Sequence, residues 1–463
     1  MIPSSATRPL LLACAVGAVG VLAPSCASYN DKARVPIQAF ERGNFERAEA
    51  LFADGVVYRS EFLVGAEAGM SAFAGGDFES ALDHLRNAER AVQAAEDRAI
   101  LGGEALTESM LSFVVNESQK TYTGEGYERV MLHAVLGLAY LSRGRADSVL
   151  VEARRVDELL TSEERLYETE YRAGGIGHFL SAIAYELVGK PGEAYIDYQR
   201  MYDKGVGGPL VGAALVRLAE RLGRDEDLER WRALPGAASM ELPPPDWPSV
   251  VLVAGIGMAP AKEEVRIDVP TRGGFFSWAV PRFTDGSSST SHLEIAFPDR
   301  GTAVRAFEVE DVAAVARKNL EDRIAWLAVR SAARGLLKRE AAKQLKQNED
   351  TAWVGYAFDV FTIATERADL RAWRTLPQRW VAARAFLPPD EAVQMALRTA
   401  DGRSVDLGTF RLAPGETMFV LGRSLSSGLT AHVVGGERVR ASTAAAPSDT
   451  TPSVAALAVE PQS

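Results

Sequence analysis

Two stretches, AFERGNFERAEALF (residues 39–52) and AFAGGDFESALDHL (residues 72–85), align without a gap and decide the fold of the first half of the chain. Their offset is 33 residues. Self-similarity at a fixed period of about 20 to 50 residues is typical of repeat proteins. The aligned glycine, aromatic, alanine and closing apolar positions are Gly43 with Gly76, Phe45 with Phe78, Ala48 with Ala81, and Phe52 with Leu85.

Three weaker copies keep the same frame within residues 140–156, 184–201 and 217–231. The pattern resembles the tetratricopeptide repeat of about 34 residues, in which glycine ends the first helix and a small alanine lets the second approach closely. A helical bundle with coincidental spacing is the alternative. Either fold is all-α, and we place it at residues 37–240. The frame residues of the weaker copies are Gly144, Val149, Ala153, Gly189, Ala194, Tyr198, Gly223 and Leu228.

The composition is that of a globular protein, with 463 residues and a net charge of −11. This length exceeds what one hydrophobic core usually supports, so at least two domains are expected. The acidic balance argues against a nucleic-acid-binding protein, which should carry a basic domain. Beyond residue 26 no apolar run reaches the roughly 18 residues that a membrane-spanning helix needs.

The N-terminus has the order of an export signal. One arginine, Arg8, precedes fifteen apolar or small residues (9–23), and the polar segment PSCASYNDK (24–32) follows them. Residues 22–26, Leu-Ala-Pro-Ser-Cys, resemble a bacterial lipobox, which predicts a signal peptide at 1–25, lipidation of Cys26 and a short anchor linker at 26–36. Cys14, in a similar setting, and plain cleavage after Ala27 are the alternatives. If Cys26 carries the lipid, Ala27 resembles the pattern of lipoproteins of the outer membrane that face the periplasm.

An insert between the second and third copies is unusually rich in polar and aromatic residues. Aromatic residues and arginines are enriched at protein interfaces, so we predict that this region binds an envelope protein or peptide. Ion pairs between helices, or solvent exposure, are the alternative for its charges. The predicted partner-binding residues are Tyr122, Tyr127, Glu128, Arg129, Glu152 and Arg155.

The second half begins after ELPPPDWP (241–248). Its four prolines cannot continue a helix and predict a stiff linker between domains. Short β-branched runs between Gly and Pro then predict strands, with Asp401-Gly402 as a hairpin turn. The fold class is therefore α+β: a tetratricopeptide-like array, then a mixed domain at 249–440 with a small β-sheet. The tail at 441–463 is expected to be disordered.

A long helix is predicted over residues 309–347, with a basic face that is either solvated or a contact for anionic lipid headgroups. It is the competing location for recognition, through Arg330, Arg334, Lys338 and Lys343. A second apolar helix is expected to end near Thr375 and is too short to span a bilayer.

We recognise no catalytic motif in the sequence. VVLVAGIG lacks the third glycine and the helix of a dinucleotide-binding turn, so no cofactor is predicted. The histidines, His84, His133, His178, His292 and His432, stand singly, without metal-ligand spacing, so no metal site is predicted. We expect a non-enzymatic protein; an envelope enzyme acting on cell-wall or surface polysaccharide, with a site assembled from distant residues, is the alternative.

Three further stretches, residues 122–144 with VEARR at 151–155, 257–270 and 366–377, resemble an uncharacterised family of bacterial envelope lipoproteins with a tetratricopeptide-like N-terminal half. The resemblance covers roughly residues 105–420. It departs at the lipobox and at Leu370, where a small polar residue is expected. It implies an outer-membrane location and this fold, and a non-catalytic scaffold remains the function we expect.

Overall fold

The structure is a computed structural model that describes residues 28–55, 60–101, 121–167, 173–235, 241–271, 274–286, 288, 290–324 and 368–439. The predicted signal peptide with Cys14 and Cys26 lies outside the described residues. So do the C-terminal tail and the four basic residues proposed for lipid contact. Of the predicted long basic helix (309–347), residues 309–324 are described, and only 312–324 are helical. The predicted start is wrong, because Val309 and Glu310 lie in a strand that pairs with residues 379–386.

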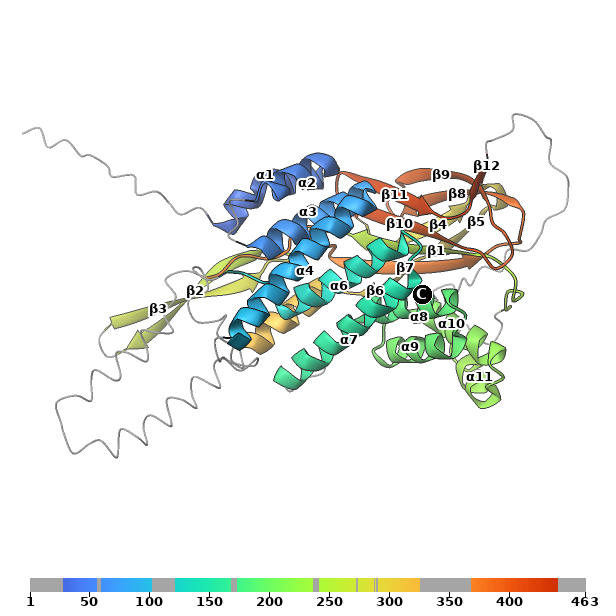
Figure 1. Cartoon of the computed structure of the whole chain (residues 1–463), viewed down its shortest axis with the longest axis horizontal. Coiled ribbons are helices and arrows are strands. Elements are labelled where there is room, and N and C mark those ends of the chain that lie inside the picture. The colour runs from blue at the N-terminus through green and yellow to red at the C-terminus, as the bar shows by residue number, and fades with distance from the viewer. Residues whose placement is uncertain are drawn as a thin grey trace, which may run out of the picture.

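The described part of residues 28–235 forms helix hairpins, one for each predicted repeat copy (Figure 1). The helical repeat prediction is therefore confirmed. None of the described helices is both long and apolar enough to cross a membrane. The helices are α1 (Tyr29–Glu41), α2 (Phe45–Ala53), α3 (Glu61–Gly75), α4 (Phe78–Leu101), α6 (Gly126–Leu141), α7 (Ala146–Tyr167), α8 (Gly175–Leu187), α9 (Pro191–Asp203), α10 (Gly208–Arg221) and α11 (Asp225–Arg232).

The same turn closes each hairpin. Gly76 has a φ of +86°, and the next residue, Asp77, donates its N–H to the carbonyl oxygen of Ala72 at 3.0 Å. This bond belongs to the Schellman ending of a helix, which requires a left-handed residue and so favours glycine. The bond recurs at the other hairpins from Asn44 to Ala39, Arg145 to Tyr140, Lys190 to Tyr185 and Arg224 to Ala219.

The described part of residues 241–439 contains two five-stranded sheets and a two-stranded hairpin, more sheet than predicted. The sheet orders are β11-β10-β1-β7-β6 and β12-β9-β8-β4-β5, and β2 pairs with β3. Asp401-Gly402 makes the predicted turn between β8 and β9. The strands are β1 (Ser249–Ile256), β2 (Lys262–Thr271), β3 (Gly274–Phe283), β4 (Leu293–Phe297), β5 (Thr302–Arg305), β6 (Phe307–Glu310), β7 (Arg379–Phe386), β8 (Ala392–Thr399), β9 (Ser404–Arg411), β10 (Thr417–Leu425), β11 (Gly428–Val434) and β12 (Glu437–Val439).

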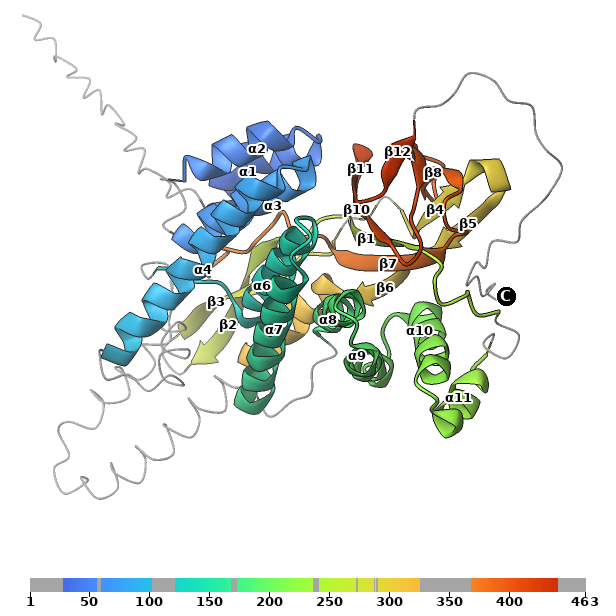
Figure 2. The ribbon, with the colours of Figure 1, turned by 45° about the vertical axis from the view of Figure 1, so that its right-hand side comes forward.

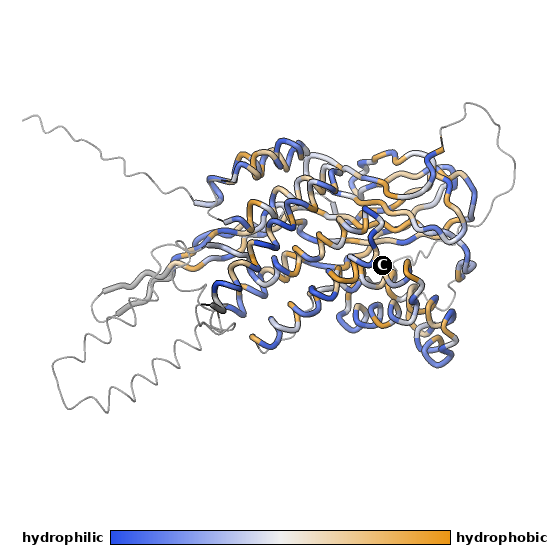
Figure 3. Tube along the Cα trace, viewed as in Figure 1, coloured by the Kyte–Doolittle hydropathy of each residue, from blue (hydrophilic) through white to orange (hydrophobic). Residues whose placement is uncertain are grey.

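The sheet containing β1 is the middle of three layers. Successive strand residues point to opposite faces. Val250 and Leu252 join the core between the two sheets, whereas Val251 and Val253 join the core that also contains the helices. Burial on both faces explains why β1 is a continuous apolar run. Figure 3 shows hydrophobic residues along these strands and hydrophilic residues on the outer helix α11.

The helix pairs follow an arc whose inner side faces the middle sheet (Figure 2). Every residue of α6, the first helix of its pair, is buried. Repeat arrays usually offer their concave side to partners, but here the chain's own second half covers it. The predicted linker, residues 241–248, contains no helix or strand, and one continuous hydrophobic core joins the segments on either side of it.

Residues 368–378 lie between the helices and the middle sheet without helical structure. The expected helical end near Thr375 is therefore wrong, and the rest of that predicted helix lies outside the described residues. The physical reason is that the N–H groups of Trp373, Arg374 and Thr375 bond to side chains of the helical array rather than to carbonyl groups of their own segment. This segment carries much of the site described next.

Candidate functional site

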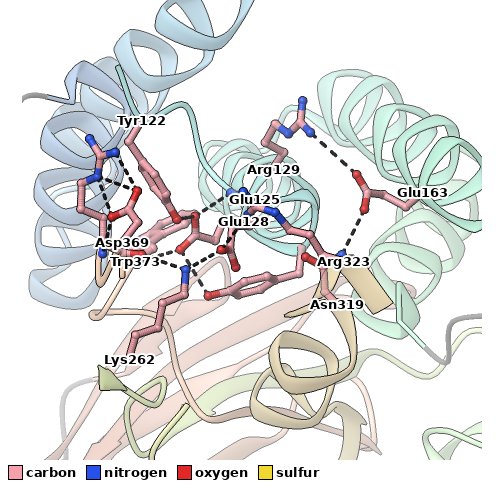
Figure 4. A network of polar contacts seen from close by, with 12 residues as sticks. Tyr122, Glu125, Glu128, Arg129, Glu163, Lys262, Asn319, Arg323, Asp369 and Trp373 are labelled. Carbon is pink, nitrogen blue, oxygen red and sulfur yellow. Dashed lines mark hydrogen bonds and ion pairs between the residues drawn. The ribbon is translucent and has the colours of Figure 1, made fainter. Parts of the chain in front are cut away.

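The three stretches that carry the family resemblance meet at one place. Tyr122 and Glu125 precede α6, Lys262 begins β2, and Trp373 lies in the segment 368–378. Figure 4 shows these side chains, together with Glu128 and Arg323, converging between the helices and the sheet. They are far apart in the sequence, so only the tertiary fold brings them together.

Glu128 is the centre of this network and is fully buried. Its carboxylate accepts hydrogen bonds from the hydroxyl groups of Tyr122 and Tyr127, from the N–H of Glu125 at 2.9 Å, and from the N–H of Trp373 at 2.6 Å. Burial, and next the neighbouring carboxylate of Glu125, raise the pKa of Glu128 to about 7. The four donors explain why a carboxyl group is tolerated in the interior.

Lys262 supplies the opposing charge, with only 2% of its surface exposed. Its Nζ forms an ion pair with Glu125 and donates to the carbonyl oxygen of Arg371 at 3.0 Å. Arg323 Nη1 also donates to Glu125 Oε1, at 3.1 Å. The phenyl ring of Phe283 lies 5.4 Å from the ammonium group, within the range of a cation–π contact. Both cations thus contact one buried carboxylate, that of Glu125.

A second buried carboxylate, Glu67 of α3, holds the same segment. It accepts the N–H groups of Arg374 at 2.7 Å and Thr375 at 2.9 Å, and the hydroxyl group of Tyr29 at 2.8 Å. Burial raises the pKa of Glu67. Together, Glu67 and Glu128 fix three consecutive N–H groups, so the network acts as a polar joint between the two halves of the chain.

A second joint is the ion cluster around Glu186 of α8. Arg384 Nη1 of β7 donates to Glu186 Oε1 at 2.7 Å, and Arg217 Nη2 of α10 lies 2.8 Å from Oε2. Burial alone would raise the pKa of Glu186, but Arg384 and Arg217 outweigh it and lower the pKa to about 2. The cluster connects the fourth and fifth hairpins to strand β7 of the middle sheet.

Glu310 of β6 caps the N-terminus of α8, although it is 134 residues away in the sequence from the N–H group that it accepts. Its carboxylate accepts the N–H of Ile176 at 3.2 Å, in the first turn of α8. A carbon side chain at Gly175 would come within 2.0 Å of the carbonyl oxygen of Val309, so only glycine allows this approach. Burial raises the pKa of Glu310 to about 7, although the helix N–H groups oppose the shift.

The structure separates the predicted partner-binding residues. Tyr122, Tyr127 and Glu128 are buried in the polar joint, where the chain's own residues contact them. The remaining three lie around a groove over α6, between α4 and α7. Arg129 pairs with Glu96 and Glu163, Glu152 pairs with His133, and Arg155 lies 3.7 Å from Glu89.

This groove has a volume of about 250 Å³ and carries charges of both signs. Arg129 is 9% exposed, and its Nε has no hydrogen-bond partner among the described residues. The lining residues are Glu89, Val92, Gln93, Glu96, Arg129, Leu132, His133, Arg155, Glu158, Leu159 and Ser162. A polar groove of this kind suits a peptide segment better than an apolar small molecule.

Sequence reasoning missed the grouping of His133 with Glu89 and Glu152. Nδ1 of His133 lies 2.7 Å from Oε2 of Glu152, and one ligand atom from each of the three residues falls within 4.8 Å of the others. The residues stand on three different helices, so no spacing motif marks them. The sequence feature that could have predicted the contact is the hairpin. Because α6 and α7 run antiparallel around Gly144, His133 and Glu152 lie opposite each other.

No protein-family model and no curated protein matches the chain. Among solved structures, it is similar to nearly identical TPR-like repeats of a kinesin-light-chain-like protein from Podosopora anserina, with 14% identity, a TM-score of 0.28, and coverage of 44% of this chain and 92% of that one. A second structure of those repeats has 13% identity, a TM-score of 0.28, and coverage of 45% and 96%. The MamA protein has 15% identity, a TM-score of 0.21, and coverage of 40% and 98%.

Proposed function

We propose that this protein is a lipid-anchored scaffold of the outer membrane, facing the periplasm, that binds an envelope protein or peptide without catalysis. The single observation that carries the binding role is the groove between α4 and α7, with Glu96, Arg129, Arg155 and Glu158 on its walls. Because the inner side of the helical arc is covered, a partner must bind elsewhere on the array, and this groove offers it charged side chains of both signs. A segment with both acidic and basic side chains is the complementary ligand.

Site-directed photo-crosslinking tests the binding role. A photoreactive residue in place of Glu158, on the groove wall, should give one crosslinked adduct of defined mass in envelope preparations. Combining it with Arg155→Glu should weaken that adduct several-fold, because the substitution reverses a charge in the groove. The matched control places the same residue at Glu220, whose side chain is 52% exposed and lies outside the groove. Equal adducts at both positions, or none from Glu158, would exclude the groove.

The anchor rests on the apolar run before Cys26 and is tested by labelled palmitate. The wild-type chain and the Cys14→Ala variant should both incorporate label, whereas Cys26→Ala should incorporate none. Label that survives in Cys26→Ala and disappears in Cys14→Ala would move the lipid to Cys14. If the wild-type chain takes up no label, the anchor is refuted and plain cleavage after Ala27 is favoured.

A further inference from the structure

We propose that Glu89, His133 and Glu152 bind one divalent transition-metal ion of the zinc type at the base of the groove. The three residues come from α4, α7 and the central helix α6. Each helix is fixed by its neighbours in the array, so the three side chains start from a rigid frame. Ion binding needs no protein partner, so this inference stands apart from the scaffold role.

The distances fit a small ion. Zinc bonds to histidine nitrogen and carboxylate oxygen are about 2.0 to 2.2 Å long, which places the ligand atoms of a tetrahedral site roughly 3.3 to 3.6 Å apart. The three ligand atoms lie within 4.8 Å of one another, and the closest pair is the 2.7 Å contact between His133 and Glu152. Side-chain rotations of about 1 Å or less therefore create the site.

The ligand types select the metal. An imidazole nitrogen with two carboxylates suits zinc and its transition-metal neighbours, whereas magnesium and calcium prefer oxygen ligands alone. Three protein ligands leave one tetrahedral position open. That position faces the groove, because His133 and Glu89 both line it. Water or an oxygen atom of a bound segment would complete the coordination.

The surroundings favour a cation. On the groove walls, Glu89, Glu96 and Glu158 outnumber Arg129 and Arg155, and Glu152 beneath them adds a further negative charge. The contacts that Glu89 would give up are weak. Arg155 lies 3.7 Å away with 45% of its side chain exposed, and Gln93 donates at 3.4 Å. Exposed ion pairs of this kind contribute little to stability.

The competing explanation is a simple hydrogen bond between His133 and Glu152 that holds α6 against α7. The chain contains an internal comparison for it. His178 of α8 pairs with Asp197 of α9 at 3.4 Å, and these two side chains are about as buried as those of His133 and Glu152. That pair is not accompanied by a third ligand among the described residues. A metal site therefore predicts that the two histidines behave differently toward zinc.

Calorimetric titration of the tag-free, chelator-treated full chain with zinc chloride tests the proposal. The wild-type chain should bind one equivalent, and Co²⁺ at the same site should give visible d–d absorption. His133→Gln, Glu152→Gln and Glu89→Gln should each weaken zinc binding by at least about 10-fold. His178→Gln is the control and should bind zinc as the wild type does.

Zinc should also raise the unfolding temperature of the wild type and of His178→Gln, because a ligand of the folded state stabilises it. It should leave His133→Gln unchanged. If substitution of the buried His133 or Glu152 destabilises the chain, Glu89→Gln still tests the site, because Glu89 is partly exposed and its loss should not disturb the fold. The proposal is overturned if the wild type shows no saturable one-equivalent binding. Equal losses in His133→Gln and His178→Gln, or no loss in Glu89→Gln, also overturn it.

Discussion

Replacing Glu186 by glutamine should lower the free energy of unfolding by about 3 to 5 kcal/mol, the range expected when one member of a buried ion cluster is removed. The glutamine side chain has the same shape but carries no charge. Arg384 and Arg217, which now share the carboxylate, would face each other without a counterion in the interior. Urea unfolding followed by circular dichroism measures the loss.

Glu220→Gln is the matched control for that experiment. Glu220 lies 3.5 Å from Arg232 on the surface, with 52% of its side chain exposed. Because exposed ion pairs contribute little, its substitution should change the free energy of unfolding by less than about 1 kcal/mol. If Glu186→Gln were no more damaging than Glu220→Gln, the ion cluster would not be a joint between the array and the sheet.

The second large effect is a dependence of stability on pH that runs opposite to ordinary acid denaturation. Glu128 and Glu310 both have folded-state pKa values raised to about 7. Between the usual glutamate pKa and about 7, the folded state therefore binds more protons than the unfolded state. Stability must fall as the pH rises through this window. Each carboxyl should contribute roughly 2 kcal/mol between about pH 5.5 and pH 8.

The measurement is the free energy of unfolding at several pH values for the wild type, Glu128→Gln and Glu310→Gln. Each variant replaces a titrating group with a neutral one of the same shape, so each should remove about 2 kcal/mol of the loss between about pH 5.5 and pH 8. Glu186, whose pKa is lowered to about 2, loses its contribution only below the usual glutamate pKa and so acts outside this window. A wild-type slope of zero or of opposite sign would contradict the assignment.

The sequence predicts the local parts of this fold well, because their signals are short-range. Gly76 and its equivalents mark each hairpin turn, and Asp401-Gly402 marks the turn between β8 and β9. The β1 stretch is predicted as a strand, but the extent of the sheets is underestimated, because the short strands β4, β5 and β6 have only four or five residues each. Segments this short carry little periodic signal, and the pairing of β4 with β8 and of β6 with β7 is set by residues far away in the sequence.

The candidate site was less predictable for a different reason. Tyr122, Tyr127 and Glu128 have the composition of a partner surface, yet both tyrosines donate to Glu128, which accepts the N–H of Trp373 in the chain's own segment 368–378. A buried internal joint and an external interface use the same residue types, since both must satisfy polar groups away from water. Sequence composition therefore identifies recognition chemistry without telling whether the recognised segment belongs to the same chain.

The covered inner side of the helical arc also sets the order in which the molecule can be completed during synthesis. Ribosomes make the array first, and the helices emerge before the strands that will cover them. Glu67 receives Arg374 only after 307 further residues, and Ser249 of β1 pairs with Thr417 in parallel only near the end of the chain. Contacts of such long range form late and slowly. Until they form, the nascent array exposes apolar surface and carboxylates, such as that of Glu67, that the second half of the chain will later bury. Aggregation therefore competes with folding until the last strands are made.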